Sequence, residues 1–275
     1  MRFQVLGTLE VQAGTRRLTP SAPKQRTVLA LLLSSANEVM PTEALVQELW
    51  EGHPPVSAPT TLQTYVYQLR KLLLRGDREA DGPRLVTKHG AYLLAVEDDM
   101  LDAVRFERLV NAAQRDLRAN KLEPASAALC QALGLWHGSA LADVVTGSRL
   151  AIYTTRLEEL RVHATKLKIE AWLRMGRHHE VIAELKQLTA VHPLDEWFHL
   201  RLMEALSLAS RRHEALEVYH RLRYILREEL GLEPGSEMQE LQRMVLATGH
   251  GPVLGRAAPN GRRGPALPQK ADCVL

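Results

Sequence analysis

Cysteine and aromatic residues are scarce in this sequence. Its 275 residues include two cysteines, Cys130 and Cys273, and only 5% are Phe, Trp or Tyr. Two cysteines cannot form a disulfide framework in a chain of this length, so we expect a cytoplasmic location. No apolar run approaches the roughly 18 residues that span a bilayer, and the first residues lack the apolar stretch of a secretory signal. We therefore expect no membrane partner.

The sequence also lacks the common signatures of enzymes. It contains no phosphate-binding G-x-x-x-x-G-K-[ST] loop, no G-x-G-x-x-G, no G-x-S-x-G, no H-E-x-x-H and no paired C-x-x-C. We expect no catalytic residue, no cofactor and no enzymatic activity. His178, His179, Glu180 and His213 resemble metal ligands, but they open helices that an internal repeat relates, so we expect no metal site. Cys130 lies among alanines and leucines and is interpreted as a small core residue.

Charge is distributed unevenly along the chain. Residues 1–96 hold 11 Lys and Arg against 8 Asp and Glu, whereas residues 97–250 hold 20 against 23. Residues 251–275 hold 4 against 1 and are rich in Gly, Pro and Ala. A basic beginning and an acidic middle suggest two parts with different partners, and the last segment has the composition of a disordered tail.

The first 96 residues predict a winged helix-turn-helix domain. Short alternating apolar segments in residues 1–20 indicate three strands, and helices are expected from Lys24 to about residue 37, from residue 41 to 51 and over 57–74. Residues 84–94 read as a β-hairpin whose turn lies at Gly90. Three short strands, three helices and a terminal hairpin follow one another in the order of a winged helix.

Residues 97–250 predict an all-α domain of tetratricopeptide-like repeats. Residues 176–180 match residues 210–214 at a shift of 34 residues, which is the period of a tetratricopeptide helix pair. The fold class is therefore mostly α, with a winged helix at residues 1–96, a helical repeat domain at 97–250 and a disordered tail at 251–275. Helices are expected over 102–118, 123–135, 149–174, 178–191, 195–209, 212–230 and 235–247.

One face of the helix over 57–74 suits DNA. Leu62, Val66, Leu69 and Leu73 recur at helical spacing and form the buried stripe. No acidic residue lies between Pro59 and Gly76, where an acid would repel phosphate. Amide and guanidinium groups pair with base edges, whereas Lys, Thr and Tyr suit phosphates. The residues expected to read bases are Gln63, Thr64, Tyr67, Gln68 and Arg70.

Phosphate contacts are expected around this helix. Two cations open the first long helix, where free N–H groups also attract phosphate, and others lie on the hairpin. Trp50 either packs in the core or points its indole N–H at a phosphate. The complete set of expected phosphate and wing residues is Lys24, Arg26, Trp50, Thr60, Lys71, Arg84, Lys88 and His89.

Several segments carry a resemblance to a known family. Residues 22–26, 44–50, 62–72 and 90–94 are similar to the OmpR-type DNA-binding domain, and residues 102–107, 132–144 and 228–235 are similar to a bacterial transcriptional activation domain. The combination resembles the Streptomyces antibiotic regulatory protein (SARP) family over about residues 1–250. The resemblance implies an activator of secondary-metabolite gene clusters that binds direct repeats in double-stranded DNA. It also implies recruitment of RNA polymerase through the sigma factor and alpha subunit, with homodimers or side-by-side copies on the DNA.

Two other classes of function remain open on the sequence alone. A protein-interaction scaffold would use the helical repeats and would not bind DNA. A ligand-gated repressor would hold a small molecule in the helical domain and block transcription. We expect Arg70→Ala to cost roughly 1–3 kcal/mol of DNA-binding free energy if Arg70 pairs with a base edge.

Overall fold

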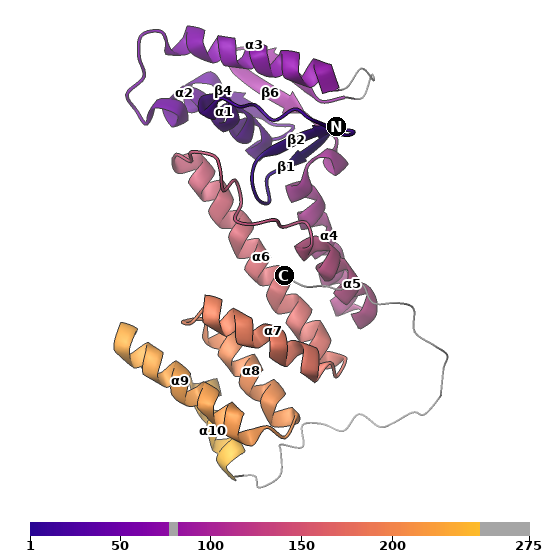
Figure 1. Cartoon of the computed structure of the whole chain (residues 1–275), viewed down its shortest axis with the longest axis vertical. Helices are drawn as coiled ribbons and strands as arrows, with labels where there is room; N and C mark the ends of the chain where they lie inside the picture. The colour runs from indigo at the N-terminus through magenta and orange to yellow at the C-terminus, as the bar shows by residue number, and fades with distance from the viewer. Residues whose placement is uncertain (77–81, 248–275) are drawn as a thin grey trace, which may run out of the picture. The chain divides into compact units, whose positions relative to one another are not determined.

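The structure is a computed structural model that describes residues 1–76 and 82–247. The described chain forms two compact units, residues 1–168 and a second unit that begins at Ile169 (Figure 1). The order of elements confirms the mostly α class, with a winged helix followed by helical repeats. The domain boundary expected at residue 96 stays a prediction. The expected disordered tail lies outside the described residues.

The first unit begins with the predicted three-stranded antiparallel sheet. Its strands are β1 (Arg2–Gln4), β2 (Glu10–Ala13) and β3 (Arg16–Arg17), in that order. Phe3 pairs with Val11 across the sheet, and both side chains are buried. The residues between β1 and β2 are also largely buried, and they bond to Asp102 and to the irregular segment 137–143 of the same unit.

Three helices and a second sheet complete the winged helix. α1 (Pro23–Ser34), α2 (Thr42–Trp50) and α3 (Ala58–Gly76) pack on one another through leucine-rich faces, and β5 (Arg84–Lys88) and β6 (Ala91–Ala95) form the predicted hairpin. An additional strand, β4 (Val39–Pro41), pairs with β6 and gives the order β4-β6-β5. The sequence did not reveal β4 because only its partner, which lies far along the chain, makes these three residues a strand.

The helices that follow the hairpin belong partly to the same unit. A single 3-10 turn (Asp98–Met100) leads into α4 (Asp102–Arg118), which packs along α5 (Leu122–Leu133). An irregular segment then leads to α6 (Ser148–Arg174), whose last residues belong to the second unit. Within the first unit the rings of Phe106 and Trp136 meet edge to face, with 5.5 Å between their centroids.

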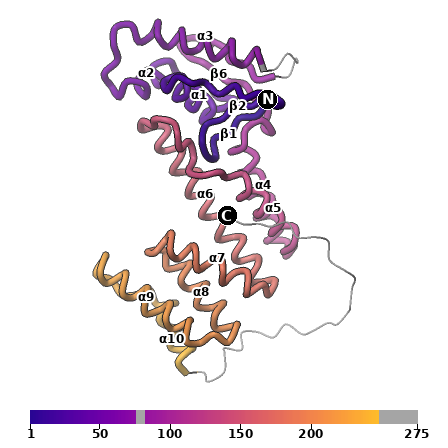
Figure 2. The backbone as a smooth tube through the Cα atoms, in the orientation of Figure 1, coloured from indigo at the N-terminus to yellow at the C-terminus, as the bar shows by residue number. Residues whose placement is uncertain are grey.

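The second unit contains successive helices that pack on their neighbours. α7 (His178–Val191) packs on α8 (Glu196–Leu208), α8 packs on α9 (Arg212–Leu230), and α10 (Ser236–Ala247) contacts both α8 and α9. The tube in Figure 2 traces these reversals of the chain. The 34-residue echo has a structural counterpart, because residues at equivalent positions of the two copies are all buried. The equivalent residues are Leu185 and Tyr219, Leu188 and Leu222, and Trp172 and Leu206.

Three carboxylates, which we call the linking carboxylates, join the winged helix to residues 102–150 within the first unit. They are Glu48, Asp102 and Asp143, and each accepts hydrogen bonds from backbone N–H groups that lie far away in sequence. Backbone bonds reinforce the contact: the N–H groups of His137, Leu141 and Ala142 donate to the carbonyls of Leu6, Val5 and Gly7 at 2.8, 3.0 and 3.1 Å. The winged helix and the beginning of the helical region therefore fold as one body.

Glu48 on α2 holds the beginning of α6. Its carboxylate accepts the backbone N–H groups of Arg149 and Leu150, each at 3.0 Å, and the residue is only 7% exposed. A negative charge suits this position, because the first N–H groups of a helix lack partners within the helix and carry partial positive charge. The fit is tight, since a methyl group on Gly147 would lie 2.7 Å from the Glu48 carboxyl carbon.

We expect Glu48→Ala to lower the free energy of unfolding by about 2–3 kcal/mol, because a buried N–H group and a partly buried one lose their acceptor. Urea unfolding of the full chain, followed by circular dichroism, measures the change. Gln47→Ala is the matched control, because Gln47 is exposed on the same helix. A loss no larger than that of Gln47→Ala would show that Glu48 does not support α6.

Asp102 links the start of α4 to the turn after β1. Its carboxylate accepts the N–H group of Val5 at 2.9 and 3.0 Å and that of Leu6 at 3.0 Å. Burial raises the pKa of Asp102 to about 6, although the N–H groups of Leu6, Val5 and Ala103 act in the opposite direction. Protonation of this carboxyl is consequently easier in the folded chain than in the unfolded chain.

The stability contributed by Asp102 should therefore depend on pH. A folded pKa above the unfolded value of 3.8 gives a contribution that is complete below pH 3.8 and is lost as pH rises through about 6. The difference between these two pKa values corresponds to roughly 3 kcal/mol in the free energy of unfolding. Unfolding of the wild type and Asp102→Asn between pH 4 and 7 tests this, because Asn does not titrate. The wild type should lose stability relative to the variant as pH rises, and parallel pH profiles would contradict the assignment.

Candidate nucleic-acid interface

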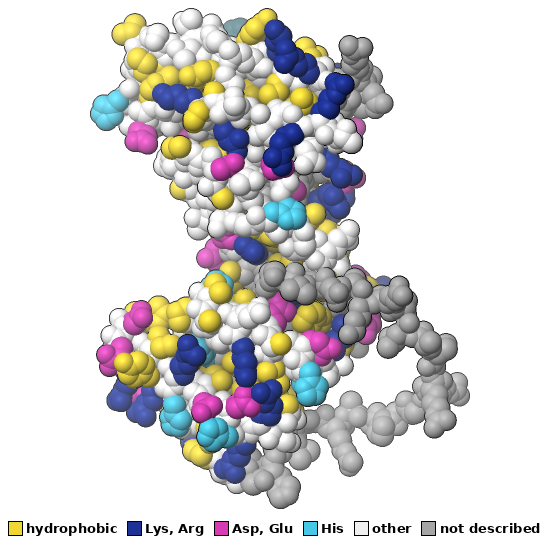
Figure 3. All heavy atoms as spheres, in the orientation of Figure 1, with side chains coloured by type: hydrophobic (Ala, Val, Ile, Leu, Met, Phe, Trp, Pro, Cys, Tyr) yellow, Lys and Arg dark blue, Asp and Glu magenta, His cyan; other side chains and the backbone are white. Residues whose placement is uncertain are grey.

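Helix α3 has one buried face and one exposed polar face. Ala58, Leu62, Val66, Leu69 and Leu73 are at most 3% exposed, so the predicted apolar stripe is confirmed. The opposite surface, which we call the polar face, is solvent-exposed, and Tyr67 at its centre is 64% exposed. Figure 3 shows Lys and Arg side chains over α3, whose sequence holds no acidic residue. The polar face consists of Thr60, Gln63, Thr64, Tyr67, Gln68 and Lys71.

Neighbouring elements hold both edges of the polar face. On one edge, Gln25 Nε2 at the start of α1 donates a hydrogen bond to Gln68 Oε1. On the other edge, Arg70 reaches strand β5. Within the helix, Thr64 Oγ1 donates to the carbonyl of Thr60 at 3.1 Å. The structure therefore brings together α1, α3 and the hairpin around one exposed surface.

The guanidinium of Arg70 donates hydrogen bonds to strand β5 of the hairpin. Nε donates to the carbonyl of Leu85 at 2.8 Å, and Nη2 donates to Thr87 Oγ1 at 2.6 Å. This placement differs from the expected base-reading role, because two nitrogens already bond to β5. The fork of donors on an arginine suits such a paired contact. Helical periodicity does not reveal this contact, because Thr87 lies on a different element.

The hairpin presents three of the expected contact residues. Arg84, Lys88 and His89 are exposed on β5 and its turn, and Gly90 adopts the positive φ of 62° that the tight turn requires. The carbonyl of Gly90 accepts the N–H group of Thr42 at 3.0 Å, so the turn is bound to the start of α2. The wing is consequently supported from α2 as well as from α3.

Trp50 and Lys24 form a pair. The Nζ of Lys24 lies 4.5 Å from the centroid of the Trp50 ring, within the range of a cation–π interaction. Lys24 is exposed at the start of α1 and Trp50 is half-buried at the end of α2. The indole thus supports the ammonium group of Lys24 near the beginning of α1.

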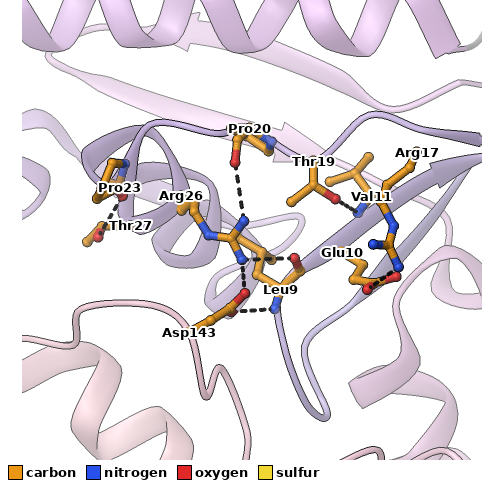
Figure 4. Close-up of polar contacts among 10 residues, drawn as sticks. All are labelled: Leu9, Glu10, Val11, Arg17, Thr19, Pro20, Pro23, Arg26, Thr27 and Asp143. Carbon is orange, nitrogen blue, oxygen red and sulfur yellow. Dashed lines mark hydrogen bonds and ion pairs between the residues drawn. The ribbon is translucent and has the colours of Figure 1, made fainter.

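Arg26 is held away from solvent. Its guanidinium donates to the carbonyl of Pro20 at 3.2 Å and that of Leu9 at 3.1 Å, and it forms an ion pair with Asp143 (Figure 4). Asp143 also accepts the N–H group of Leu9 at 2.8 Å, and the Arg26 side chain is only 16% exposed. Arg26, which was expected to contact phosphate together with Lys24, instead forms an ion pair with the linking carboxylate Asp143.

Within residues 1–76 and 82–247, no group of three or more His, Cys, Asp or Glu residues could hold a metal ion. No helix in those segments is both long and apolar enough to cross a membrane.

Comparison with known families decides the identity of the chain. The family described as "Bacterial transcriptional activator domain" matches residues 101–246, and "Transcriptional regulatory protein, C terminal" matches residues 17–91. The regulatory protein DnrI of Streptomyces peucetius is 39% identical, and the alignment covers all of both chains. The chain belongs to the SARP family. Its two matched domains make it a DNA-binding transcriptional activator.

Other relatives are larger than this SARP. The regulatory protein AfsR of Streptomyces griseus is 36% identical over 90% of this chain but only 24% of its own length. A solved structure, "Mycobacterium tuberculosis EmbR in complex with low affinity phosphopeptide", is 34% identical with a TM-score of 0.83. That likeness covers 89% of this chain and 64% of the EmbR chain.

We expect Arg70→Ala to destabilise the wing of this SARP by about 1–2 kcal/mol, because a charged donor pair is lost from β5. Urea unfolding measures the loss, and Thr87→Val provides a control that removes only the Thr87 hydroxyl. DNA binding by Arg70→Ala should weaken similarly for all sequences. Altered preference at a single base pair would instead support the base-reading role.

Proposed function

We propose that the polar face of α3 enters the major groove of double-stranded DNA and reads base edges. Gln63, Thr64, Tyr67 and Gln68 supply amide and hydroxyl groups for this, while Thr60 and Lys71 contact phosphates. The exposed cations of the wing, together with Lys24 on α1, neutralise phosphates on either side. Arg26 and Arg70 have internal partners, so they position the elements that carry these contacts.

The exposure of an acid-free polar face on a packed helix supports this proposal most directly. A helix fits the major groove, and a carboxylate on this surface would repel phosphate. The buried stripe on the opposite side and the contacts at both edges hold α3 in place. Its exposed side chains can then meet a duplex with little loss of backbone freedom.

The link between the winged helix and the helical region suggests how binding is coupled to activation. The linking carboxylates hold α4 and the beginning of α6 on the DNA-binding elements within one unit. DNA binding then also sets the orientation of these helices. We propose that they hold RNA polymerase through its sigma factor and alpha subunit, and that copies bind as a homodimer or side by side on direct repeats.

The family of this chain indicates which genes are activated. DnrI and AfsR are named as regulatory proteins of Streptomyces, and the family is that of antibiotic regulators. We propose that this chain acts in the cytoplasm as a pathway-specific activator of a secondary-metabolite gene cluster.

Selection from random duplexes tests the DNA-binding proposal. The purified full chain should enrich a short motif repeated in direct orientation, and footprinting should protect that motif. Transcription in vitro with RNA polymerase should rise when the site is occupied. Failure to retard any duplex at low salt would support a protein-interaction scaffold, and reduced transcription would support a repressor.

We expect Lys71→Ala to weaken binding to all sequences and to lower the slope of log K against log salt by about one, because one phosphate contact is lost. Titrations at several salt concentrations measure the slope. Lys121→Ala is the control, because Lys121 is exposed directly before α5, and α5 lies away from α3 (Figure 1). Equal slopes for wild type and Lys71→Ala would remove Lys71 from the phosphate contacts.

A further inference from the structure

The hydrogen bond between Gln25 and Gln68 connects a helix outside the proposed base-reading set to a residue within it. Gln25 lies in the first turn of α1, and its Nε2 donates to Gln68 Oε1 on the edge of the polar face. Gln25 is half-buried and Gln68 is exposed. Neither side chain belongs to the core, so the contact has little to do with packing.

This bond favours one direction of the Gln68 amide. A free glutamine can rotate its terminal amide and exchange the positions of its oxygen and its NH₂ group. Because Gln25 donates, the Gln68 oxygen is held toward α1 and the NH₂ group is held away from it. The oxygen still has a second lone pair, and both hydrogens of the NH₂ group remain available.

An amide in this state has the groups that adenine requires. Glutamine pairs with adenine by accepting from N6 and donating to N7 in the major groove. We propose that Gln25 is a specificity-determining residue that orients Gln68 to read one adenine. The inference rests on the proposed function and goes further, because it names the base and assigns a positioning role to a residue of α1.

Binding to DNA makes the orientation important. In water an exposed bond between two neutral side chains contributes little to folding, since water replaces it readily. In a groove from which water is displaced, a wrongly turned amide places its NH₂ group against the N6 donor of adenine. Gln25 therefore affects the choice of base while affecting stability only slightly.

The test measures base discrimination by the full chain. Duplexes selected by the wild type are varied at every base pair, and relative affinities are determined by competition. At one adenine we expect about 5- to 150-fold discrimination, which Gln68→Ala abolishes. Gln25→Met keeps the side-chain length but cannot donate, so it should lower discrimination at the same position by about 2- to 10-fold.

A double-substitution cycle separates this role from a general one. Gln25→Met should have no further effect on base preference when Gln68 is already Ala, because the two residues act through one contact. Gln25→Glu can only accept, so it should turn the Gln68 amide around and lower the preference for adenine further. Ratios between sequences cancel any uniform repulsion by the new carboxylate.

Several outcomes would overturn the inference. They are a uniform loss of affinity in Gln25→Met, an effect at a base pair that Gln68→Ala does not change, additive effects of the two substitutions, or a base other than adenine at the Gln68 position. Circular dichroism and an unchanged affinity for unrelated duplexes establish that each variant is folded. If the wild type itself selects no duplex, the proposed function fails rather than this inference alone.

Discussion

Carboxylates that accept buried or partly buried backbone N–H groups hold the first unit together. Asp102 and Asp143 bind the turn between β1 and β2, and Glu48 binds the first turn of α6. Each satisfies donors that would otherwise be costly to remove from water. The winged helix supplies one of these carboxylates, Glu48, and the segment that follows it supplies the other two, Asp102 and Asp143. The DNA-binding elements are thereby fixed to the helices that follow them.

Some cations of the winged helix have partners within the protein. Arg26 neutralises Asp143 beside the first sheet, and Arg70 ties α3 to β5. Lys24, supported by the ring of Trp50, stays exposed at the start of α1. Cations with internal partners fix the geometry, and those left in solvent can meet phosphate. A composition count alone does not separate these two groups.

The helices and their faces were largely predictable from the sequence. The stripe of Leu62, Val66, Leu69 and Leu73 gave both the position of α3 and its buried side, because helical periodicity is a local property. The 34-residue echo gave the repeat of the second unit for the same reason. Strand β4 was missed, since it exists only through pairing with β6. The roles of Gln25 and Thr87 were missed because their partners lie on other elements.

The sequence by itself determined the class of the fold, the location of α3 and the chemistry of its polar face, which are encoded in spacing and residue type. Only the tertiary structure decided which polar side chains already have a partner. Hydrogen bonds and ion pairs depend on the positions of two groups within a few ångströms, and residues such as Arg26 and Asp143 approach one another only after the chain has folded. A periodic pattern records which side of a helix is buried but contains no information about these distant pairings.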